Sequence, residues 1–294
     1  MDPLDAPREE LEAVEAGRAF ADLSDYRKVR VNGADAQGWL NDLVTCDVAA
    51  LTPGSAHRSL LLSPTGRILA DFGLGCDDEG YLLLQPADQP DHIGLLLSRY
   101  VLSSAVDLRD ATNELALFAV LGTARELVGR PGLTPSVVGS GVDLVMPVGR
   151  TAWRIEDGLV RHDLVEVGEV TLEVRRIRAG IPRMSVDFGQ DALPAEVGLD
   201  WTIDTAKGCF LGQESVAKVR NLGHPPRVLR HLRADAPVGA GATVVAGGTP
   251  VGEVTSAAVD GTGAVALAMV AWASAAGPLR TADGIDLGAV GSMD

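Results

Sequence analysis

Apolar positions along the chain recur with two different periods, which predict both helices and strands. Apolar residues at every third or fourth position indicate amphipathic helices, whereas alternation between turn residues indicates strands. The predicted helices cover residues 10–20, 36–44, 90–101, 124–128 and 168–179. The predicted strands cover residues 26–31, 59–62, 67–74, 81–85, 115–120, 141–146 and 152–155, the first of them at a sheet edge. Because antiparallel meanders replace a regular strand–helix alternation, the pattern favours an α+β fold over a Rossmann fold.

The character of the sequence changes after Pro225. Short β-rich runs separated by glycines follow it, which is typical of a small antiparallel β-barrel. These runs cover residues 228–234, 242–246, 249–256 and 263–271. We therefore expect two domains, 1–225 and 226–294.

The chain is acidic, with a net charge of −15 over 294 residues, which argues against direct binding of nucleic acid. Positive charge is nevertheless concentrated in two segments. Residues 175–183 hold four arginines and no acid, and residues 207–233 hold six basic residues and one acid. A local basic zone predicts an anionic small molecule or an acidic partner surface. The alternative is that these charges lie on separate solvated faces.

Neither a membrane segment nor a metal site is predicted. The first 15 residues are acidic, unlike a signal peptide, and the longest apolar run, 264–276, is shorter than the roughly 20 residues that cross a bilayer. The three cysteines, Cys46, Cys76 and Cys209, lie far apart, and the five histidines show no ligand spacing. We expect a cytoplasmic protein in a reducing compartment, without a membrane partner.

Cys209 lies in the run K-G-C-F-L-G-Q-E-S-V-A-K-V-R-N-L-G, from Lys207 to Gly223. The spacing predicts a helix that ends at Gly223 and begins at or just after Cys209. Free amide groups, the helix dipole and Lys207 would there favour a thiolate. The alternative is a buried structural cysteine in a turn.

This run and the run R-A-G-I-P-R-M-S-V-D-F-G-Q-D-A-L-P-A-E-V-G-L at 178–199 together resemble the signature of YgfZ-type proteins. Those proteins are relatives of the glycine-cleavage T-protein, an aminomethyltransferase, and serve in iron–sulfur cluster assembly or repair. The resemblance implies two interleaved ferredoxin-like α+β subdomains followed by the C-terminal barrel. It also implies that tetrahydrofolate binds where these parts meet, so we expect the thiol at the entrance of a cavity.

The resemblance and the residue types together give a set of candidate site residues. Cys209 and Asp71 are the candidates for chemistry. The candidates for binding folate are Arg178, Asp187, Gln190, Asp191, Lys207, Gly208 and Gln213. For Asp71 the alternative is a solvent-facing strand position, and for the segment 187–191 it is a hydrogen-bonded turn without a ligand.

Two positions depart from the T-protein pattern. The stretch G-R-I-L-A-D-F has Ala70 where T-proteins carry the first residue of an acidic pair, so only Asp71 remains. Arg178 stands where T-proteins carry a glutamate that binds the pterin, and YgfZ-type proteins carry arginine there. Both departures argue against transfer of an aminomethyl group, which needs a carboxylate at the reacting nitrogen.

Three hypotheses about function follow. The first is a tetrahydrofolate-binding accessory factor for iron–sulfur enzymes, which supports tRNA modification indirectly and uses Cys209 as its functional thiol. Its partners would be folate and iron–sulfur client enzymes or assembly proteins. The second is a folate-dependent aminomethyl or one-carbon transferase. The third is a folate-binding regulatory module without chemistry of its own.

Overall fold

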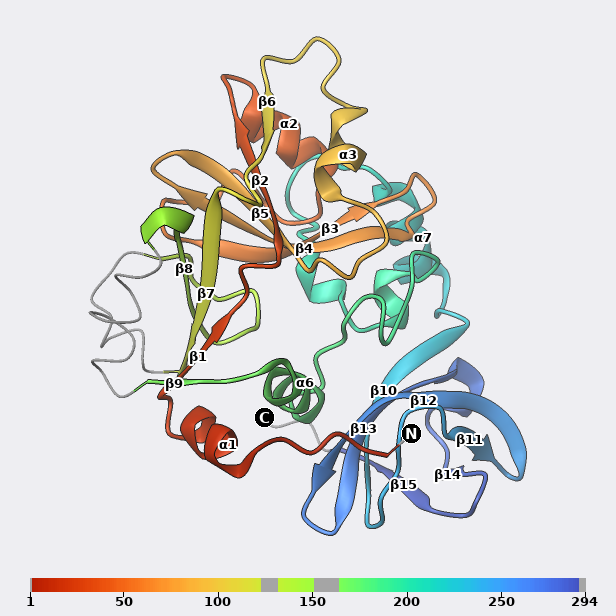
Figure 1. Cartoon of the computed structure of the whole chain (residues 1–294). Coiled ribbons are helices and arrows are strands. Elements are labelled where there is room, and N and C mark those ends of the chain that lie inside the picture. Colours follow the sequence, from red (N-terminus) through yellow and green to blue (C-terminus); the bar gives the residue numbers. More distant parts are fainter. Residues whose placement is uncertain (1, 123–131, 151–163, 291–294) are drawn as a thin grey trace.

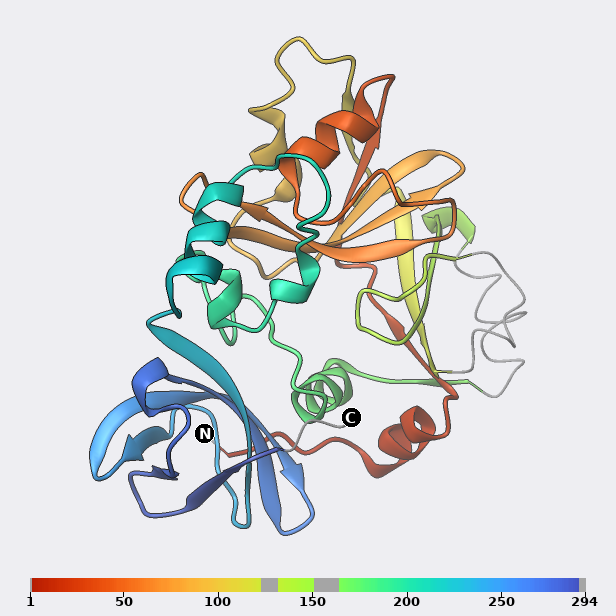
Figure 2. The same cartoon turned by 180° about the vertical axis from the view of Figure 1, so that it is seen from behind.

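The computed structural model describes residues 2–122, 132–150 and 164–290. Three lobes surround the centre of the molecule (Figure 1), and the view from behind shows the same arrangement (Figure 2). The predicted helix at 124–128 and the predicted strand at 152–155 lie outside the described residues. The helices are α1 (Arg8–Glu15), α2 (Ala36–Leu43), α3 (Ile93–Ser98), α6 (Glu169–Arg178) and α7 (Gln213–Leu222).

Two sheets build the first part of the chain. The five-stranded sheet has the order β3-β4-β5-β2-β6, and the four-stranded sheet has the order β8-β7-β1-β9. Their strands are β1 (Ala19–Asp22), β2 (Arg27–Asn32), β3 (Ala56–Leu62), β4 (Ile68–Asp77), β5 (Gly80–Gln85), β6 (Asp107–Asp110), β7 (Leu115–Leu121), β8 (Gly141–Pro147) and β9 (Val165–Glu166). The predicted three-strand meander is confirmed as β3, β4 and β5, paired antiparallel.

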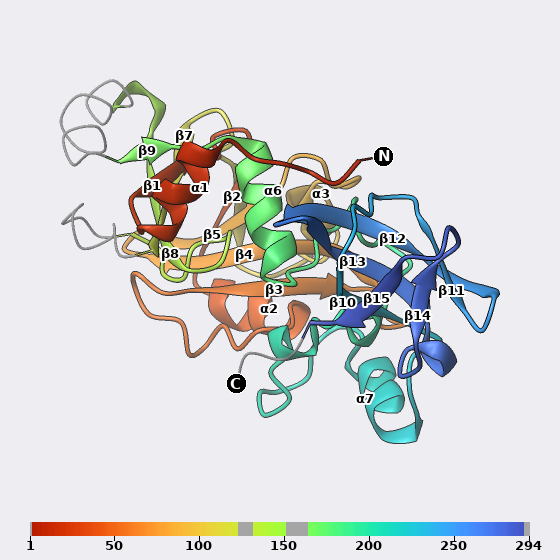
Figure 3. The same cartoon turned by 90° about the horizontal axis from the view of Figure 1, so that it is seen from below.

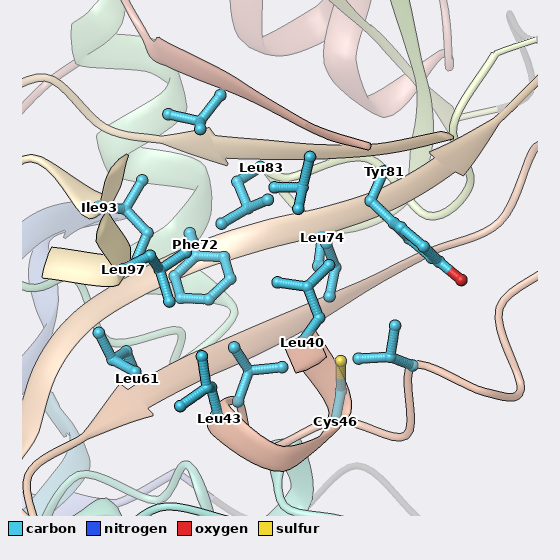
Figure 4. Close-up of a cluster of buried hydrophobic side chains, with 14 of the residues drawn as sticks. Leu40, Leu43, Cys46, Leu61, Phe72, Leu74, Tyr81, Leu83, Ile93 and Leu97 are labelled. Carbon is cyan, nitrogen blue, oxygen red and sulfur yellow. The ribbon is translucent and has the colours of Figure 1, made fainter. Parts of the chain in front are cut away.

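The five-stranded sheet is buried on both faces. Leu83 of β5 packs on one side with Leu40 of α2 and Ile93 of α3, as Figure 4 shows. Its neighbours Leu82 and Leu84 point to the other side, where they join the core formed with the four-stranded sheet. Because successive strand residues face opposite sides, burial on both faces explains the uninterrupted leucine run of β5.

Two sequence predictions in this region were wrong. The first helix ends at Glu15, because Gly17 takes the left-handed backbone (φ 65°) that terminates helices, and Phe20 lies in β1 instead. Strand β2 lies between β5 and β6 and is not an edge strand. Its basic residues suggested solvent, but Lys28 is fully buried and Arg30 pairs with Asp77 at 2.6 Å.

A closed six-stranded barrel follows, with the order β10-β13-β12-β11-β14-β15. Its strands are β10 (Arg227–Ala234), β11 (Thr243–Ala246), β12 (Thr249–Asp260), β13 (Gly263–Ala271), β14 (Leu279–Thr281) and β15 (Asp286–Ala289). The last two are short and have no clear apolar alternation, so the sequence did not predict them. The predicted α+β fold with a C-terminal antiparallel barrel is confirmed.

Helix α6 joins the barrel to the rest of the molecule, and Figure 3 shows it running alongside β12 and β13. The joint centres on Asp187, which is 4% exposed. Its carboxylate accepts hydrogen bonds from Arg176 of α6 (2.7 Å), from Thr255 of β12 (2.6 Å) and from Ser256 of the same strand. The backbone N–H of Arg183 donates a further bond at 2.9 Å. One buried carboxylate therefore ties together a helix, a loop and the barrel.

Asp187→Ala is expected to lower the free energy of unfolding by about 3–5 kcal/mol, because it removes one of the two carboxylates that pair with the buried Arg176 and the acceptor of the Thr255 and Ser256 hydroxyls. Urea unfolding of the purified protein measures this. Asp191→Ala is the matched control. The Asp191 side chain is 70% exposed in its pair with Arg227, so its loss should cost less than about 1 kcal/mol. Equal losses for the two variants would contradict the assignment.

Candidate functional site

A cavity of about 510 Å³ lies where the two sheets and α6 meet. Its wall is formed by the end of β1, by β3 and β4, by the loop 135–139, by one face of α6 and by the loop 181–184. Glu169, Leu172, Glu173 and Arg176 form the α6 part of the wall, since helical residues three or four apart share a face. The volume falls within the range of roughly 300–1,000 Å³ that is typical of small-molecule sites.

Asp71 lies in the wall of this cavity and is 6% exposed, so the solvent-facing alternative is wrong. Arg58 binds both of its oxygens, Nε to Oδ1 at 2.8 Å and a terminal nitrogen to Oδ2 at 2.5 Å. The same guanidinium donates to the carbonyl of Pro182 at 2.8 Å. Gln89 holds the backbone of Asp71 on both sides, at 3.1 and 2.5 Å. The carboxylate is therefore fixed and neutralised by a bidentate pair.

Sequence reasoning missed Arg58, which lies one residue before the predicted strand 59–62, because β3 begins earlier, at Ala56. In the β3–β4 pairing Arg58 lies opposite Gly73, and Leu60 lies opposite Asp71. Arg58 and Asp71 are thus diagonal neighbours on one face, within reach of a long side chain. Extending the predicted strand by two residues toward the N-terminus would have brought Arg58 into the hairpin, beside Asp71.

The other arginines of the wall are also paired with carboxylates. Arg183 contacts Asp88 and Glu173, each at 2.7 Å. Arg176 contacts Glu173 at 2.7 Å in addition to Asp187. The three arginines of the cavity wall therefore have their charge compensated within the protein. Their arrangement favours a ligand that is recognised by shape and neutral hydrogen bonds.

Cys209 is exposed and lies outside the cavity wall. Helix α7 begins at Gln213 with Gly212 as its N-cap, so Cys209 precedes the helix by more residues than the sequence suggested. Lys207 does not face the thiol: its ammonium donates to the backbone carbonyls of Asn41, Val44 and Cys46 at 2.6–2.7 Å. Burial lowers the pKa of Lys207. The lysine thus anchors one end of the Cys209 loop.

Gly212 anchors the other end of this loop. Its φ is 84°, and a Cβ there would lie 2.6 Å from the carbonyl oxygen of Ser63 in the β3–β4 turn. Ser215 donates to the carbonyl of Pro64 in the same turn at 3.1 Å. Only glycine permits this approach, so the loop is fixed against the hairpin.

The remaining candidate binding residues do not gather in the cavity. Arg178 donates to the carbonyl of Val259 in the barrel at 2.8 Å, and Gln190 contacts the carbonyl of Leu69 and the carboxylate of Asp91. None of the predicted residues except Asp71 lines the cavity: Arg178, Asp187, Gln190, Asp191, Lys207, Gly208, Cys209 and Gln213 all lie elsewhere. Their roles stay predictions.

A second hollow of about 390 Å³ adjoins the cavity, and the two share His57, Arg58 and Trp201. The segment 201–206 forms much of its wall, which ends just before Lys207. Trp201 is 68% exposed, a large apolar surface at the junction of the two hollows.

The described part of the chain contains neither a cluster of metal-binding side chains nor a helix that could span a membrane. No group of three or more histidine, cysteine, aspartate or glutamate side chains stands close enough to hold a metal ion. Within the same residues, the helices are all too short or too polar to span a membrane.

Comparison with known proteins identifies the superfamily. Residues 4–131 match the family described as GCVT N-terminal domain. A putative chloroplastic transferase of Arabidopsis thaliana is 24% identical over 87% of this chain and 65% of its own. An aminomethyltransferase of Geobacillus kaustophilus is 27% identical over 76% of this chain and 70% of its own. The tRNA-modifying protein YgfZ of Vibrio atlanticus is 23% identical over 71% of this chain and 67% of its own. The chain thus spans about two thirds of the length of these relatives.

The fold comparison agrees with this result. The glycine cleavage system aminomethyltransferase T of Bartonella henselae superposes with a TM-score of 0.84, covering 99% of this chain and 91% of that protein at 22% identity. The chain thus carries the GCVT N-terminal domain and is similar over most of its length to proteins of the glycine-cleavage T-protein superfamily. Within it, the resemblance to YgfZ-type proteins that the Cys209 and Arg178 segments indicate is confirmed by the relatives found.

The loop 135–139 of the cavity wall depends on the fully buried Asp143. Its carboxylate accepts hydrogen bonds from the hydroxyl of Ser136 and from the backbone N–H of Val137 at 2.7 Å. Burial raises the pKa of Asp143 to about 7. No buried cation is paired with this carboxylate among the described residues.

Stability is expected to fall as the pH rises from about 4 to about 7, because the folded protein keeps the Asp143 proton that the unfolded chain releases. The contribution is at most about 1.4 kcal/mol per pH unit. The Asp143→Asn variant has no such proton to keep, so its stability should lack this pH dependence. The difference in free energy of unfolding, wild type minus variant, should therefore fall between pH of about 4 and about 7 and stay constant above it. Urea unfolding at several pH values measures it. A difference that does not change with pH would refute this role.

Proposed function

We propose that this protein is a tetrahydrofolate-binding accessory factor for the assembly or repair of iron–sulfur enzymes, with Cys209 as its functional thiol. The relatives support a folate-binding protein of the T-protein type. The cavity at the junction of the two sheets and α6 is the candidate folate site. The clients would be cytoplasmic iron–sulfur enzymes or assembly proteins, and tRNA modification would depend on the protein indirectly.

The observation that supports accessory binding over transfer is the state of Asp71. Both of its carboxylate oxygens accept hydrogen bonds from Arg58, so the carboxylate would have to give up this pair to contact a reacting amine. Ala70, the neighbouring position, is fully buried and has no polar side-chain atom. The carboxylate that would assist a reacting amine is therefore engaged, and its acidic neighbour is missing.

The fit of folate to the cavity has one specific consequence. Arg178, in the pterin-binding position of T-proteins, points to the barrel through Val259 and does not line the cavity. The pterin would therefore need another partner in the wall, such as Tyr26. When bound, tetrahydrofolate would supply a one-carbon carrier, while the chain would bind and orient it.

A second candidate, a folate-dependent aminomethyl or one-carbon transferase, is favoured by the position of Asp71 in the cavity wall. Release of Arg58 from that carboxylate would return a base to the site.

Purified protein is expected to bind tetrahydrofolate saturably but not to convert an aminomethylated carrier protein. The reason is that Asp71, in the cavity wall, is neutralised by Arg58. Anaerobic calorimetry measures binding, and single-turnover product analysis measures transfer. A T-protein assayed in parallel controls for the carrier. Turnover would establish the transferase, and a lack of saturable binding would reject folate as the ligand.

Cys209→Ser is expected to abolish restoration of iron–sulfur enzyme activities in a deletion strain while leaving the melting temperature within a few degrees of wild type. The side chain is exposed and the change is nearly isosteric, so only chemistry should be lost. Cys76→Ser is the matched control and should restore activity, since Cys76 lies at the far end of β4. Full restoration by Cys209→Ser would leave a folate-binding regulatory module as the better description.

A further inference from the structure

Strand β4 extends beyond its neighbour β5 at the point where it carries Asp71. The pairing of the two strands runs only from Asp77 to Gly73, which lies opposite Leu84. The same antiparallel register, two residues further along each strand, would place Pro86 opposite Asp71. Proline has no backbone N–H and cannot donate to a strand. The backbone of Asp71 therefore needs a partner from elsewhere in the chain, since buried peptide groups are almost always hydrogen-bonded.

The side chain of Gln89 takes the place of the missing strand. Its carboxamide oxygen accepts from the backbone N–H of Asp71 (3.1 Å), and its carboxamide nitrogen donates to the carbonyl of the same residue (2.5 Å). Nε2 of Gln85 donates to the same oxygen at 3.1 Å. Gln89 is 3% exposed, and both lone pairs of its oxygen are used by these bonds. Although Gln89 lies in the cavity wall, its oxygen is therefore not available to a ligand.

The loop that carries Gln89 is itself fixed by groups on two strands. Arg27 of β2 donates to the carbonyls of Ala87 (2.8 Å) and Asp91 (2.9 Å). Gln85, at the end of β5, also donates to the carbonyl of Asp91, at 2.9 Å. The carboxamide of Gln89 is thus held from behind, so it can fix the backbone of β4.

The fixed backbone determines where the carboxylate of Asp71 lies. Its two oxygens accept hydrogen bonds from Nε and a terminal nitrogen of Arg58, at 2.8 and 2.5 Å. A bidentate pair needs both partners in register, and a shift of about 1 Å in the strand would leave only one of these bonds. Arg58 also donates to the carbonyl of Pro182 at 2.8 Å, so the pair connects β4 to the loop 181–184 of the wall.

We propose that Gln89 is a positioning residue of the cavity: its carboxamide replaces a strand on the open edge of β4 and thereby keeps Asp71 paired with Arg58. Gln89 acts on the site only through Asp71. Its effect on tetrahydrofolate rests on the proposed function, whereas its effect on the Arg58–Asp71 pair does not.

The first test follows the Arg58–Asp71 pair without any ligand, by the hydrogen exchange of the Arg58 Nε–H in side-chain NMR spectra. The Arg58→Lys variant identifies the signal. Gln89→Met should speed this exchange by roughly tenfold or more, because the carboxylate no longer stays in register. Asn41→Leu is the matched control, because it also removes a carboxamide that holds a backbone N–H, that of Val48 at 3.0 Å, outside the cavity. It should leave the Arg58 signal unchanged.

The second test measures the affinity for tetrahydrofolate by anaerobic calorimetry in a double-mutant cycle. Gln89→Met should weaken binding by roughly three- to tenfold, because one part of the wall is no longer rigid. In the Asp71→Ala background the same substitution should leave the affinity unchanged, since no carboxylate remains to be displaced. The melting temperature should fall by a few degrees on loss of Gln89 in both backgrounds, because the backbone groups of residue 71 lose their partner in each.

Each of two results would overturn the inference. An Arg58 signal that is unchanged in Gln89→Met, or equally changed in Asn41→Leu, would show that the pair does not depend on this carboxamide. An affinity that Gln89→Met leaves unchanged, or lowers equally with and without Asp71, would show that Gln89 does not act on the site through that carboxylate.

Two further provisions keep the tests decisive. If Gln89→Met does not fold, Gln89→Asn replaces it in both tests, since its carboxamide is one methylene too short to reach both backbone groups. If wild type does not bind tetrahydrofolate, the proposed function is rejected, and the Arg58 signal alone decides this inference.

Discussion

The structure depends on one buried carboxylate. Asp187 is removed from water and would be costly there without compensation, so Arg176, two barrel hydroxyls and a backbone amide surround it. The network can form only when α6, the loop after it and β12 are all in place. Arg176 also faces the cavity together with Glu173. The Arg176–Asp187 ion pair that attaches the barrel is therefore part of the charge network in the cavity wall. A change to the barrel attachment would also change the wall of the cavity.

The cavity wall is rich in charge but carries little uncompensated positive charge. Arg58 neutralises Asp71, and Arg183 bridges Asp88 and Glu173. Fixed ion pairs keep their geometry when a ligand enters, and this rigidity defines the shape of the site. Recognition then depends on a few neutral groups placed between the pairs. Such a wall is consistent with the proposed role, which is to hold a ligand and not to react with it.

The sequence predicts those parts of the structure that local residue patterns determine, and it does not predict those that contacts between distant residues determine. Helix α6, the β3–β4–β5 meander and most of the barrel have strong periodicity or turn signals, so they could be predicted. Lys28 could not, because a lysine in a strand indicates solvent unless the carbonyls that receive it are known. The same holds for the site: Asp71 was found by its motif, whereas Arg178 and Lys207 look like ligand contacts in sequence but are used by distant carbonyls.

The loop that carries Cys209 is tied down at both ends, by Lys207 on three carbonyls and by Gly212 against the hairpin turn. Because the fixed residues Lys207 and Gly212 lie so near Cys209 in the chain, the loop cannot move far enough to bring the sulfur to a small molecule in the cavity. A molecule that reacts with Cys209 would therefore approach the exposed thiol from solvent. The thiol and the cavity are therefore separate, and two segments connect them: the β3–β4 hairpin and the segment 201–206.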